Sequence, residues 1–392
     1  MSQQRKSVRV VIVNWRTPLL TERAARSLWP QLQAGDELVV VDNASASADP
    51  HDNSLAHLRQ LGAQLGSAGP ARFGLVQSRR NGGFGYGVNL GARNLRQDAL
   101  VLLNSDAYAL EGFVDALTAP LGHDLVEATT ARLLLEGRWR LVGDGAEPAS
   151  PQAPSAVKPA SPQSSSPQPP GAVGPNAPSR AESADPQSPG AVEAQTEPTT
   201  GAAHSTGSAQ LRGLDGGIWV SDPSGVELIN STGNVVDACG NGHDRSWLAP
   251  ADSPLPAPEV FGLCGGACAI DADAWRAVGG VRTDLFMYYE DTDLSYKLRE
   301  AGYEVRFVAG AIVDHEHAAS SGTSSPMFLR VNARNRIIVA AQHAPWGVVA
   351  RAIARSIARA VRSGGRGPVA RGVLQGLLAL PRALRHRTAS RP

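Results

Sequence analysis

Two acid-rich clusters in the last third of the chain contain residue types that suit acid–base and metal chemistry. They are Glu290, Asp291 and Asp293 in the first cluster, and Asp314, His315, Glu316 and His317 in the second. Aromatic and apolar residues precede the first cluster, and such surroundings raise the proton affinity of a carboxylate, as a general base requires. Imidazole and carboxylate together suit Mn²⁺ or Mg²⁺. The clusters therefore predict a base and a metal ligand, joined by a helix over 291–301 and a strand over 305–313.

The first cluster also has a simpler explanation, and the second contains a second candidate ligand. Acidic residues in the first turn of a helix are favourable charges, which accounts for one or two of the three carboxylates in the first cluster. It does not account for the aromatic residues that line the approach at 286–289. In an extended segment His317 faces the same way as His315, so His317 stays open as an alternative ligand.

The elements that must position these residues follow from hydrophobic patterns. Strand patterns cover 8–14, 37–41, 74–77 and 99–103, and helix patterns cover 17–33, 55–65 and 81–94. This alternation predicts an α/β fold with a mostly parallel sheet flanked by helices. Ligands of such sheets bind at the carboxyl ends of the strands, where Asn14, Asp42 and Asp106 fall. We expect the site at that edge.

The strand-end residues can each be interpreted in two ways. A carboxylate at Asp42 can accept hydrogen bonds from a nucleotide, or it can cap the following segment. The run Asn104-Ser105-Asp106 is similar to a shortened Asp-x-Asp metal clamp, and it is also typical of a turn. His315 adds a second ligand type, which favours the metal site.

The glycine-rich run at 81–89 limits the choice of cofactor. Its sequence, NGGFGYGVN, does not fit the Gly-x-Gly-x-x-Gly pattern that follows a first strand in dinucleotide-binding enzymes, nor a P-loop with its lysine. An NAD-linked oxidoreductase is therefore disfavoured. The glycines can bring backbone NH groups close to a ligand, or they can shape a tight turn.

Composition divides the chain into four segments. Residues 146–212 consist mainly of Pro, Ser, Ala, Gly and Gln, which predicts a disordered insertion between two halves of one domain, 1–145 and 213–343. Within the second half, 225–236 has the pattern of a hairpin that turns at 231–234. The fourth segment, 344–392, contains Arg but neither Asp nor Glu.

This fourth segment predicts a helical basic tail. Arg351, Arg355, Arg359 and Arg362 recur at helical spacing, with Val and Ile on another face. Such a helix can pack on the body with its Arg face in water, or it can dock on anionic lipid. We expect docking on an anionic membrane surface, because the Arg-only composition exceeds what solubility requires. The net charge of +1 for the whole chain argues against nucleic acid as a partner.

The cysteines and the N-terminus bear on location. Cys239, Cys264 and Cys268 cannot form a disulfide framework and lack zinc-finger spacing, which predicts buried thiols in a reducing compartment. The N-terminal apolar run fits a first strand better than a signal peptide, and no apolar stretch reaches transmembrane length. We expect a cytoplasmic protein, peripheral at the inner face of the plasma membrane.

Taken in order, several segments resemble one enzyme family. These segments are VVIVNW, VVVDNAS, RNGGFGYGVNLG, LLNSDA, GGACAIDADAWRAVGGV and FMYYEDTDLSYKLREAGY, ending at DHEH. In them the chain is similar to family 2 inverting glycosyltransferases, and within that family to the rhamnosyltransferase-like and galactofuranosyltransferase-like branch. The resemblance covers about residues 8–145 and 213–343. It implies the GT-A fold, a nucleotide-sugar-binding domain around a mostly parallel sheet.

The resemblance also implies roles for the candidate residues. Asp291 would be the catalytic base with Glu290 beside it, and Asp106 and His315 would hold Mg²⁺ or Mn²⁺ on the donor diphosphate. The nucleotide sugar would be bound by Asn14, Asp42, Asn81, Asn89, Asp106 and Arg334. One departure is that Asn104 replaces the first Asp of the usual clamp, which leaves fewer charged metal ligands.

The implied function is that of a metal-dependent hexosyltransferase. A sugar, with rhamnose first and UDP-linked hexoses or galactofuranose next, would move from a nucleoside diphosphate to a hydroxyl of a glycan or polyprenyl-linked acceptor in cell-envelope polysaccharide synthesis. The alternative is a catalytically inactive nucleotide-sugar-binding scaffold, recruited to the membrane by the tail. Intact Asp106, Asp291 and His315 argue against this alternative, and Asn104 is in its favour.

Overall fold

The computed structural model describes residues 5–144, 210–213, 216–316 and 325–387. Most of the predicted insertion, 146–209, lies outside the described residues, and so does His317. The disorder of that segment and the division of the chain into four segments therefore stay predictions.

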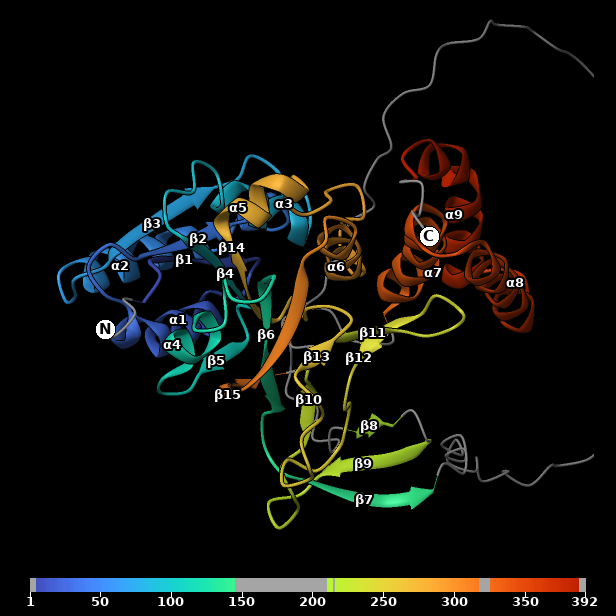
Figure 1. Ribbon diagram of the computed structural model, residues 1–392, viewed down its shortest axis with the longest axis horizontal. Helices are drawn as coiled ribbons and strands as arrows, with labels where there is room; N and C mark the ends of the chain where they lie inside the picture. Colours follow the sequence, from blue (N-terminus) through green and yellow to red (C-terminus); the bar gives the residue numbers. More distant parts are fainter. Residues whose placement is uncertain (1–4, 145–209, 214–215, 317–324, 388–392) are drawn as a thin grey trace, which may run out of the picture. The chain divides into compact units, whose positions relative to one another are not determined.

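A ten-stranded sheet organises the described part of the chain (Figure 1). Eight strands follow one another in the order β13-β15-β6-β14-β4-β1-β2-β3, while β10 pairs with β6 and β5 pairs with β15. Their bounds are β1 (Val8–Asn14), β2 (Glu37–Asp42), β3 (Arg72–Gln77), β4 (Ala99–Leu103), β5 (Ala107–Ala109), β6 (Val126–Leu135), β10 (Ile229–Ser231), β13 (Glu259–Val260), β14 (Ala267–Asp271) and β15 (Glu304–His315).

The first half of the chain forms a parallel part of this sheet, as its alternating pattern predicts. β1 pairs in parallel with β2 and β4, and β2 pairs in parallel with β3. β14 then runs antiparallel to both β4 and β6, while β15 is parallel to β6 and antiparallel to β5. The fold is therefore mixed α/β, with antiparallel strands added by the second half of the chain.

Helices cover both faces of the sheet. On one face lie α1 (Pro18–Leu28), α2 (Ser54–Gly66) and α4 (Phe113–Thr118), and on the other lie α3 (Phe84–Gly91), α5 (Ala272–Val278) and α6 (Glu290–Glu300). The helix pattern over 17–33 ends earlier than predicted, because Pro30 lies in a separate 3₁₀ turn, Trp29–Gln31.

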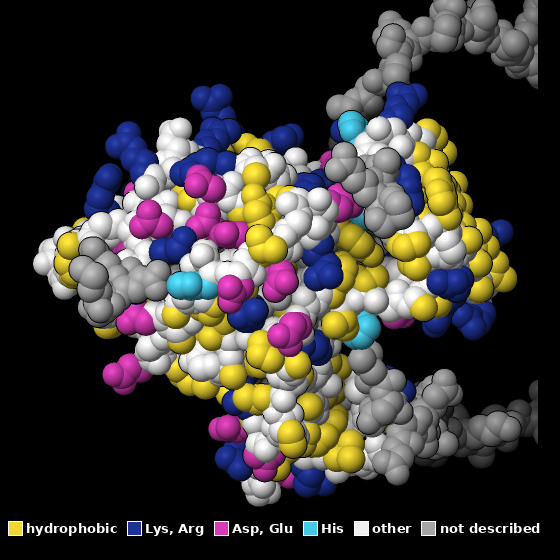
Figure 2. All heavy atoms as spheres, viewed as in Figure 1, with side chains coloured by type: hydrophobic (Ala, Val, Ile, Leu, Met, Phe, Trp, Pro, Cys, Tyr) yellow, Lys and Arg dark blue, Asp and Glu magenta, His cyan; other side chains and the backbone are white. Residues whose placement is uncertain are grey.

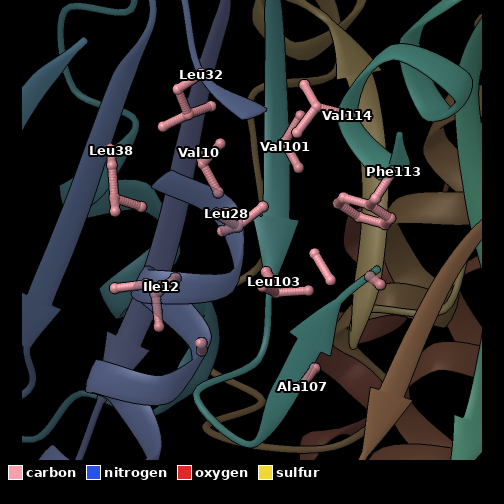
Figure 3. Packing of buried hydrophobic residues seen from close by; sticks show 14 of the residues in the cluster. Val10, Ile12, Leu28, Leu32, Leu38, Val101, Leu103, Ala107, Phe113 and Val114 are labelled. Carbon is pink, nitrogen blue, oxygen red and sulfur yellow. The ribbon is translucent and has the colours of Figure 1, made fainter. Parts of the chain in front are cut away.

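The two faces of the sheet are apolar because successive side chains of a buried strand alternate between them. Val10 belongs to one core and Val11 to the other. Figure 3 shows the first core, in which Leu28 of α1 and Phe113 of α4 pack beside Val10 and Val101. Both cores hold the strand ends in place, and these ends carry the candidate site residues.

The hairpin predicted over 225–236 is wrong. β10 pairs with β6, whereas β11 (Asn234–Val236) pairs with β12 (Gly242–Asp244). The segment 231–234 therefore connects β10 of the large sheet to a separate hairpin of β11 and β12. Next to this region, β7 (Trp139–Asp144), β9 (Gly217–Ser221) and β8 (Gln210–Arg212) form a separate small sheet.

The helical tail is present as predicted. α7 (Pro326–His343) is followed by α8 (Trp346–Arg362) and α9 (Pro368–Arg385), and the three pack against one another. α7, which precedes the predicted tail, also contacts α6, so it connects α8 and α9 to the helix that begins with the acidic cluster. Among the helices that the structure describes, none is long and apolar enough to span a membrane.

Candidate functional site

A cavity of about 350 Å³ lies at the carboxyl ends of the central strands. Its wall includes residues that follow β1 and β4, parts of β10 and β12, the turn before α6, and the end of β15. Among the lining residues are Asn81, Asp106, Asp244, Glu290, Asp291 and His315. Both acid-rich clusters of the sequence thus contribute to one cavity, together with a strand end from the first half of the chain.

Strand pairing brings Asp106 and His315 together. β5 and β15 pair so that His315 lies opposite Ala107, the residue after Asp106. The Nε2 atom of His315 is 3.2 Å from Oδ1 of Asp106, and the Nδ2 atom of Asn104 is 3.5 Å from the same Nε2. Asp106 and His315 are both buried. The two residues predicted as metal ligands are therefore neighbours in the fold.

Asn230 contacts the other nitrogen of the His315 ring. Its Oδ1 is 2.5 Å from Nδ1 of His315, and Asn230 is itself buried on β10. A carbonyl oxygen only accepts, so Nδ1 carries the hydrogen and a neutral ring has its lone pair on Nε2. That lone pair faces the carboxylate of Asp106, and two acceptors at such a distance repel unless a proton or a cation lies between them.

This pair fits a divalent cation that takes its other ligands from a substrate. Within the described ranges no group of three or more His, Cys, Asp or Glu side chains can hold a metal ion. Mg²⁺ is commonly bound by one or two carboxylates plus substrate phosphates, and imidazole with oxygen ligands also suits Mn²⁺. Asp106 and His315 supply one ligand of each kind.

Glu290 and Asp291 line the same cavity from the start of α6. Backbone NH groups of Gly265 and Thr292 donate to Asp291, at 3.3 and 2.6 Å. Glu290 is buried, and its Oε2 has no hydrogen-bond partner among residues that the structure describes. Burial raises the pKa of both carboxyl groups, and the charge of Asp291 raises the pKa of Glu290 further. Carboxylates with a raised pKa are suited to accept a proton near neutral pH.

The turn before these acids adopts an unusual backbone. Phe286, Tyr288 and Tyr289 have φ angles of 68°, 65° and 69°, a region that residues with side chains rarely adopt. The glycine-rich run packs on this turn, because the Phe84 NH donates to the Phe286 carbonyl at 2.9 Å. A Cβ atom on Gly83 would lie 1.9 Å from that carbonyl oxygen. The glycines therefore shape a close contact between two segments of the wall.

Asp293, the third acid of the first cluster, is not among the lining residues. It is fully buried, with Nε2 of His343 at 3.0 Å from Oδ1 and Nζ of Lys297 at 3.0 Å from Oδ2. Burial alone raises the pKa of Asp293, but the hydrogen bond from His343 and the Lys297 charge outweigh it and hold that pKa below its usual value. Asp293 therefore joins α6 to α7.

The residues predicted to bind the nucleotide sugar fall into two groups. Asp106 and Asn81 line the cavity, whereas the cavity wall does not include Asn14, Asp42, Asn89 or Arg334. Asn14 and Asp42 are buried behind it and hydrogen-bond to each other at 3.0 Å. Their nucleotide-binding role stays a prediction.

The other two have backbone partners. Asn89 donates to the Val281 carbonyl at 2.6 Å and accepts from the Val281 NH at 3.0 Å. Arg334 donates to the Asp284 carbonyl at 2.6 Å. In this structure both side chains hold the segment that leads to α6, and their role toward a donor also stays a prediction.

Sequence reasoning did not find Asp244 and Asn230. Asp244 ends β12 and lines the cavity. Desolvation and the charge of Asp291 raise the pKa of Asp244 to about 6, although a hydrogen bond with Ser231 lowers it in part. The signal was the density of polar residues over 230–244, part of which was interpreted as a hairpin turn at 231–234. Trp15 also lines the cavity, and its Nε1 is buried without a partner in the described part of the chain.

Comparison with known proteins finds no family model that matches the chain. Over 100 residues it is 32% identical to N-acetylglucosaminyl-diphospho-decaprenol L-rhamnosyltransferase of Mycobacterium tuberculosis, in strains CDC 1551 and H37Rv. This match covers 25% of the chain and 31% of the relative, so the chain spans about a third of the length of the curated relatives it matches. The match is to a glycosyltransferase, in agreement with the resemblance expected from the motifs.

Three solved structures are similar over most of the chain. GalNAc-T7 with UDP, GalNAc and Mn²⁺ has a TM-score of 0.48 at 15% identity, covering 87% of this chain and 48% of that one. Staphylococcus aureus TarS 1–349 with UDP-GlcNAc has a TM-score of 0.47 at 12% identity, covering 96% and 81%. The mannosyltransferase PcManGT of Pyrobaculum calidifontis with GDP-Man and Mn²⁺ has a TM-score of 0.43 at 13% identity, covering 98% and 74%.

Proposed function

We propose that this protein is an inverting glycosyltransferase that moves a sugar from a nucleoside diphosphate to a hydroxyl group. The observation that carries the proposal is the convergence of two pairs on one cavity: Glu290 with Asp291, and Asp106 with His315. The first pair suits proton removal, and the second suits a cation beside a diphosphate. The local match to a rhamnosyltransferase supports the same reaction.

The reaction requires one displacement. Asp291 removes the proton from the acceptor hydroxyl, and that oxygen forms a bond to the anomeric carbon as the bond to the diphosphate oxygen breaks on the opposite side. This inverts the anomeric configuration and needs no nucleophile from the protein. Asp106 and His315 would hold Mg²⁺ or Mn²⁺, whose charge, when bound, neutralises the departing diphosphate. Gly265 and Thr292 hold the Asp291 carboxylate in a fixed orientation.

The proposed donor is a nucleoside-diphosphate rhamnose, and the proposed acceptor is a glycan or a polyprenyl-linked sugar of the cell envelope. The support is the similar protein of Mycobacterium tuberculosis, an N-acetylglucosaminyl-diphospho-decaprenol L-rhamnosyltransferase. UDP-linked hexoses and galactofuranose follow as alternative donors. A lipid-linked acceptor implies that the enzyme works at a membrane surface.

The outer side of α8 and α9 has the properties of a membrane-docking face. Val361, Leu374 and Leu378 are exposed at 67%, 58% and 73%. Figure 2 shows hydrophobic side chains along the edge of the C-terminal helices with Lys and Arg side chains beside them. The sequence contains no Asp or Glu after Glu316, so Arg side chains on this face meet no acidic neighbours from their own helices. We propose that this face binds anionic lipid, which places the protein at the inner surface of the plasma membrane.

Transfer assays with an Asp291→Asn variant test the proposed function. A panel of nucleotide sugars, with and without Mn²⁺, first identifies the donor through a rise in the melting temperature of the protein. Asp291→Asn should bind that donor normally but transfer about 10²–10⁴-fold more slowly. Asp252→Asn, a change of an exposed aspartate, serves as the matched control. Near-wild-type turnover of Asp291→Asn would refute the base, and donor binding without any transfer by the wild type would support the scaffold alternative.

A further inference from the structure

The strained turn that precedes the acid pair needs a partner that holds it. Three of its residues, Phe286, Tyr288 and Tyr289, have left-handed backbone angles although none is glycine. Such conformations persist only where the surrounding structure fixes them, and they occur often at functional sites. The turn leads without interruption into Glu290 and Asp291, so its conformation decides where both carboxyl groups point.

Asn335 of α7 supplies the main contact to this turn. Its side chain is fully buried, and its Nδ2 lies 3.0 Å from the Leu285 carbonyl, 2.9 Å from the Met287 carbonyl and 2.8 Å from the Tyr288 carbonyl. An amide nitrogen carries two hydrogens, so three carbonyls share them. The opposite orientation of the amide would place its oxygen against three carbonyl oxygens, which repel it. The hydrogen bonds therefore fix both the Asn335 amide and the turn.

The neighbouring residue of α7 adds a fourth carbonyl to the same contact. Arg334 donates from Nη2 to the Asp284 carbonyl at 2.6 Å. Further along α7, His343 binds Asp293 through Nε2 at 3.0 Å. α7 thus holds α6 at two points: at the turn before it and at a buried acid within its first turns.

We propose that Asn335 is a positioning residue of the catalytic site, which holds the turn at 285–288 so that Glu290 and Asp291 face the cavity. The effect on catalysis rests on the proposed function. The hydrogen bonds between Asn335 and the turn do not depend on that function. Asn335 does not line the cavity, so it acts on the reaction through the turn and not through the substrate. No sugar or nucleotide contact is assigned to it.

The test combines a kinetic measurement with one that needs no substrate. Asn335→Ala removes the donor, and Asn335→Asp keeps the size while replacing the NH₂ group with oxygen. For both variants, kcat should fall about 100-fold, the loss expected for a displacement of about 1 Å, while KM for the donor stays close to the wild-type value. Arg330→Ala, an exposed change on the same helix, should leave both constants unchanged.

Hydrogen exchange of the backbone amides gives the independent readout. In Asn335→Ala, a peptide covering 284–292 should exchange faster than in the wild type, while peptides from β1 and β4 exchange as before. If Asn335→Ala does not fold, Asn335→Ser, which retains one donor, should show a smaller change in the same peptide. Unchanged exchange at 284–292 with unchanged kcat overturns the proposal. Faster exchange in a protein that shows no transfer with any donor supports the positioning contact and refutes the proposed function separately.

Discussion

His315 and Asp106 lie 209 positions apart in the chain, yet Nε2 of His315 is 3.2 Å from Oδ1 of Asp106. The antiparallel pairing of β5 with β15 sets this distance, and Asn230 turns the ring by accepting from Nδ1. Backbone pairing therefore sets the distance between His315 and Asp106, and the side chain of Asn230 sets the orientation of the His315 ring. That side chain can be removed without touching either predicted ligand.

We expect Asn230→Ala to weaken Mn²⁺ binding about 10–100-fold, the usual effect of losing the partner that orients a metal-binding histidine. The physical reason is that the His315 ring loses the acceptor that keeps its lone pair on Nε2. Isothermal titration of Mn²⁺ in the presence of a nucleoside diphosphate measures the affinity. Asn53→Ala, at an exposed helix start with no side-chain hydrogen bond, is the control. Equal affinities in all three proteins would show that Asn230 does not orient the ring.

His343 should make the stability of the protein depend on pH. Burial alone lowers the pKa of His343, but its bonds to Asp293 at 3.0 Å and Glu300 at 2.8 Å outweigh this and raise the pKa above its ordinary value. The folded state thus holds this proton more tightly than the unfolded state. The stabilisation is complete below about pH 6.5 and is lost as pH rises through the folded pKa, at about 1.4 kcal/mol for each unit of pKa difference.

Urea unfolding of the wild type and of His343→Gln at pH 6 and pH 9 measures this effect. The free energy of unfolding of the wild type should fall more between the two pH values than that of the variant. Lys297 and Arg282, which also face Asp293, are the same in both proteins. The carboxyl groups with raised pKa in the cavity also lower stability as pH rises, and they cancel in the comparison. Parallel pH dependences would contradict the assignment.

The sequence was sufficient to predict the parallel half of the sheet and the edge at which the cavity lies. Polar residues that directly follow an apolar strand are visible in the local sequence. Asp106 could therefore be predicted as a strand-end residue, and both halves of the chain could be predicted to meet at one edge of the sheet. His315 was recognisable because an imidazole follows a long apolar strand. The helical tail followed from regular spacing alone.

The remaining features depend on contacts between distant segments. Asn230 lies on β10, whose partner β6 comes from the first half of the chain, whereas local patterning favoured a hairpin over 225–236. Asp244 lies on β12, which pairs with the neighbouring β11. Asp42 looked equally suited to a nucleotide or to a cap, and in the fold it accepts a hydrogen bond from Asn14. No local rule predicts left-handed aromatic residues such as Tyr288, whose carbonyl accepts a hydrogen bond from Asn335 on another helix.

Gly83→Ala should destabilise the protein and slow the reaction. A Cβ atom there would meet the Phe286 carbonyl at 1.9 Å, and the backbone φ of 85° disfavours any side chain. We expect a loss of about 1–3 kcal/mol in the free energy of unfolding, as for other overpacked sites. Gly66→Ala is the matched control, since no atom lies within 4 Å of a Cβ at that position. Urea unfolding and kcat are measured on the same samples of both variants. A Gly83→Ala protein as stable as Gly66→Ala would contradict the close contact between Gly83 and Phe286.

Vesicle binding tests the proposed docking face of α8 and α9 with two pairs of substitutions. Val361→Ser with Leu378→Ser removes exposed apolar area, and Arg359→Gln with Arg362→Gln removes two charges, each worth about 1 kcal/mol near an anionic surface. The double arginine variant should therefore bind vesicles with anionic lipid about 10–30-fold more weakly, with no change on neutral vesicles. The apolar variant should bind both kinds more weakly.

Two matched controls make this comparison specific. Leu19→Ser changes an apolar residue of α1 that is 70% exposed, and Arg59→Gln changes an exposed arginine of α2. Both should bind vesicles like the wild type, because neither lies on α8 or α9. All variants should keep wild-type transfer to a water-soluble acceptor, since α8 and α9 contribute no residue to the cavity wall. Equal recovery of every protein on anionic vesicles, or a wild-type dimer in solution that Val361→Ser with Leu378→Ser dissociates, would assign this face to something other than lipid.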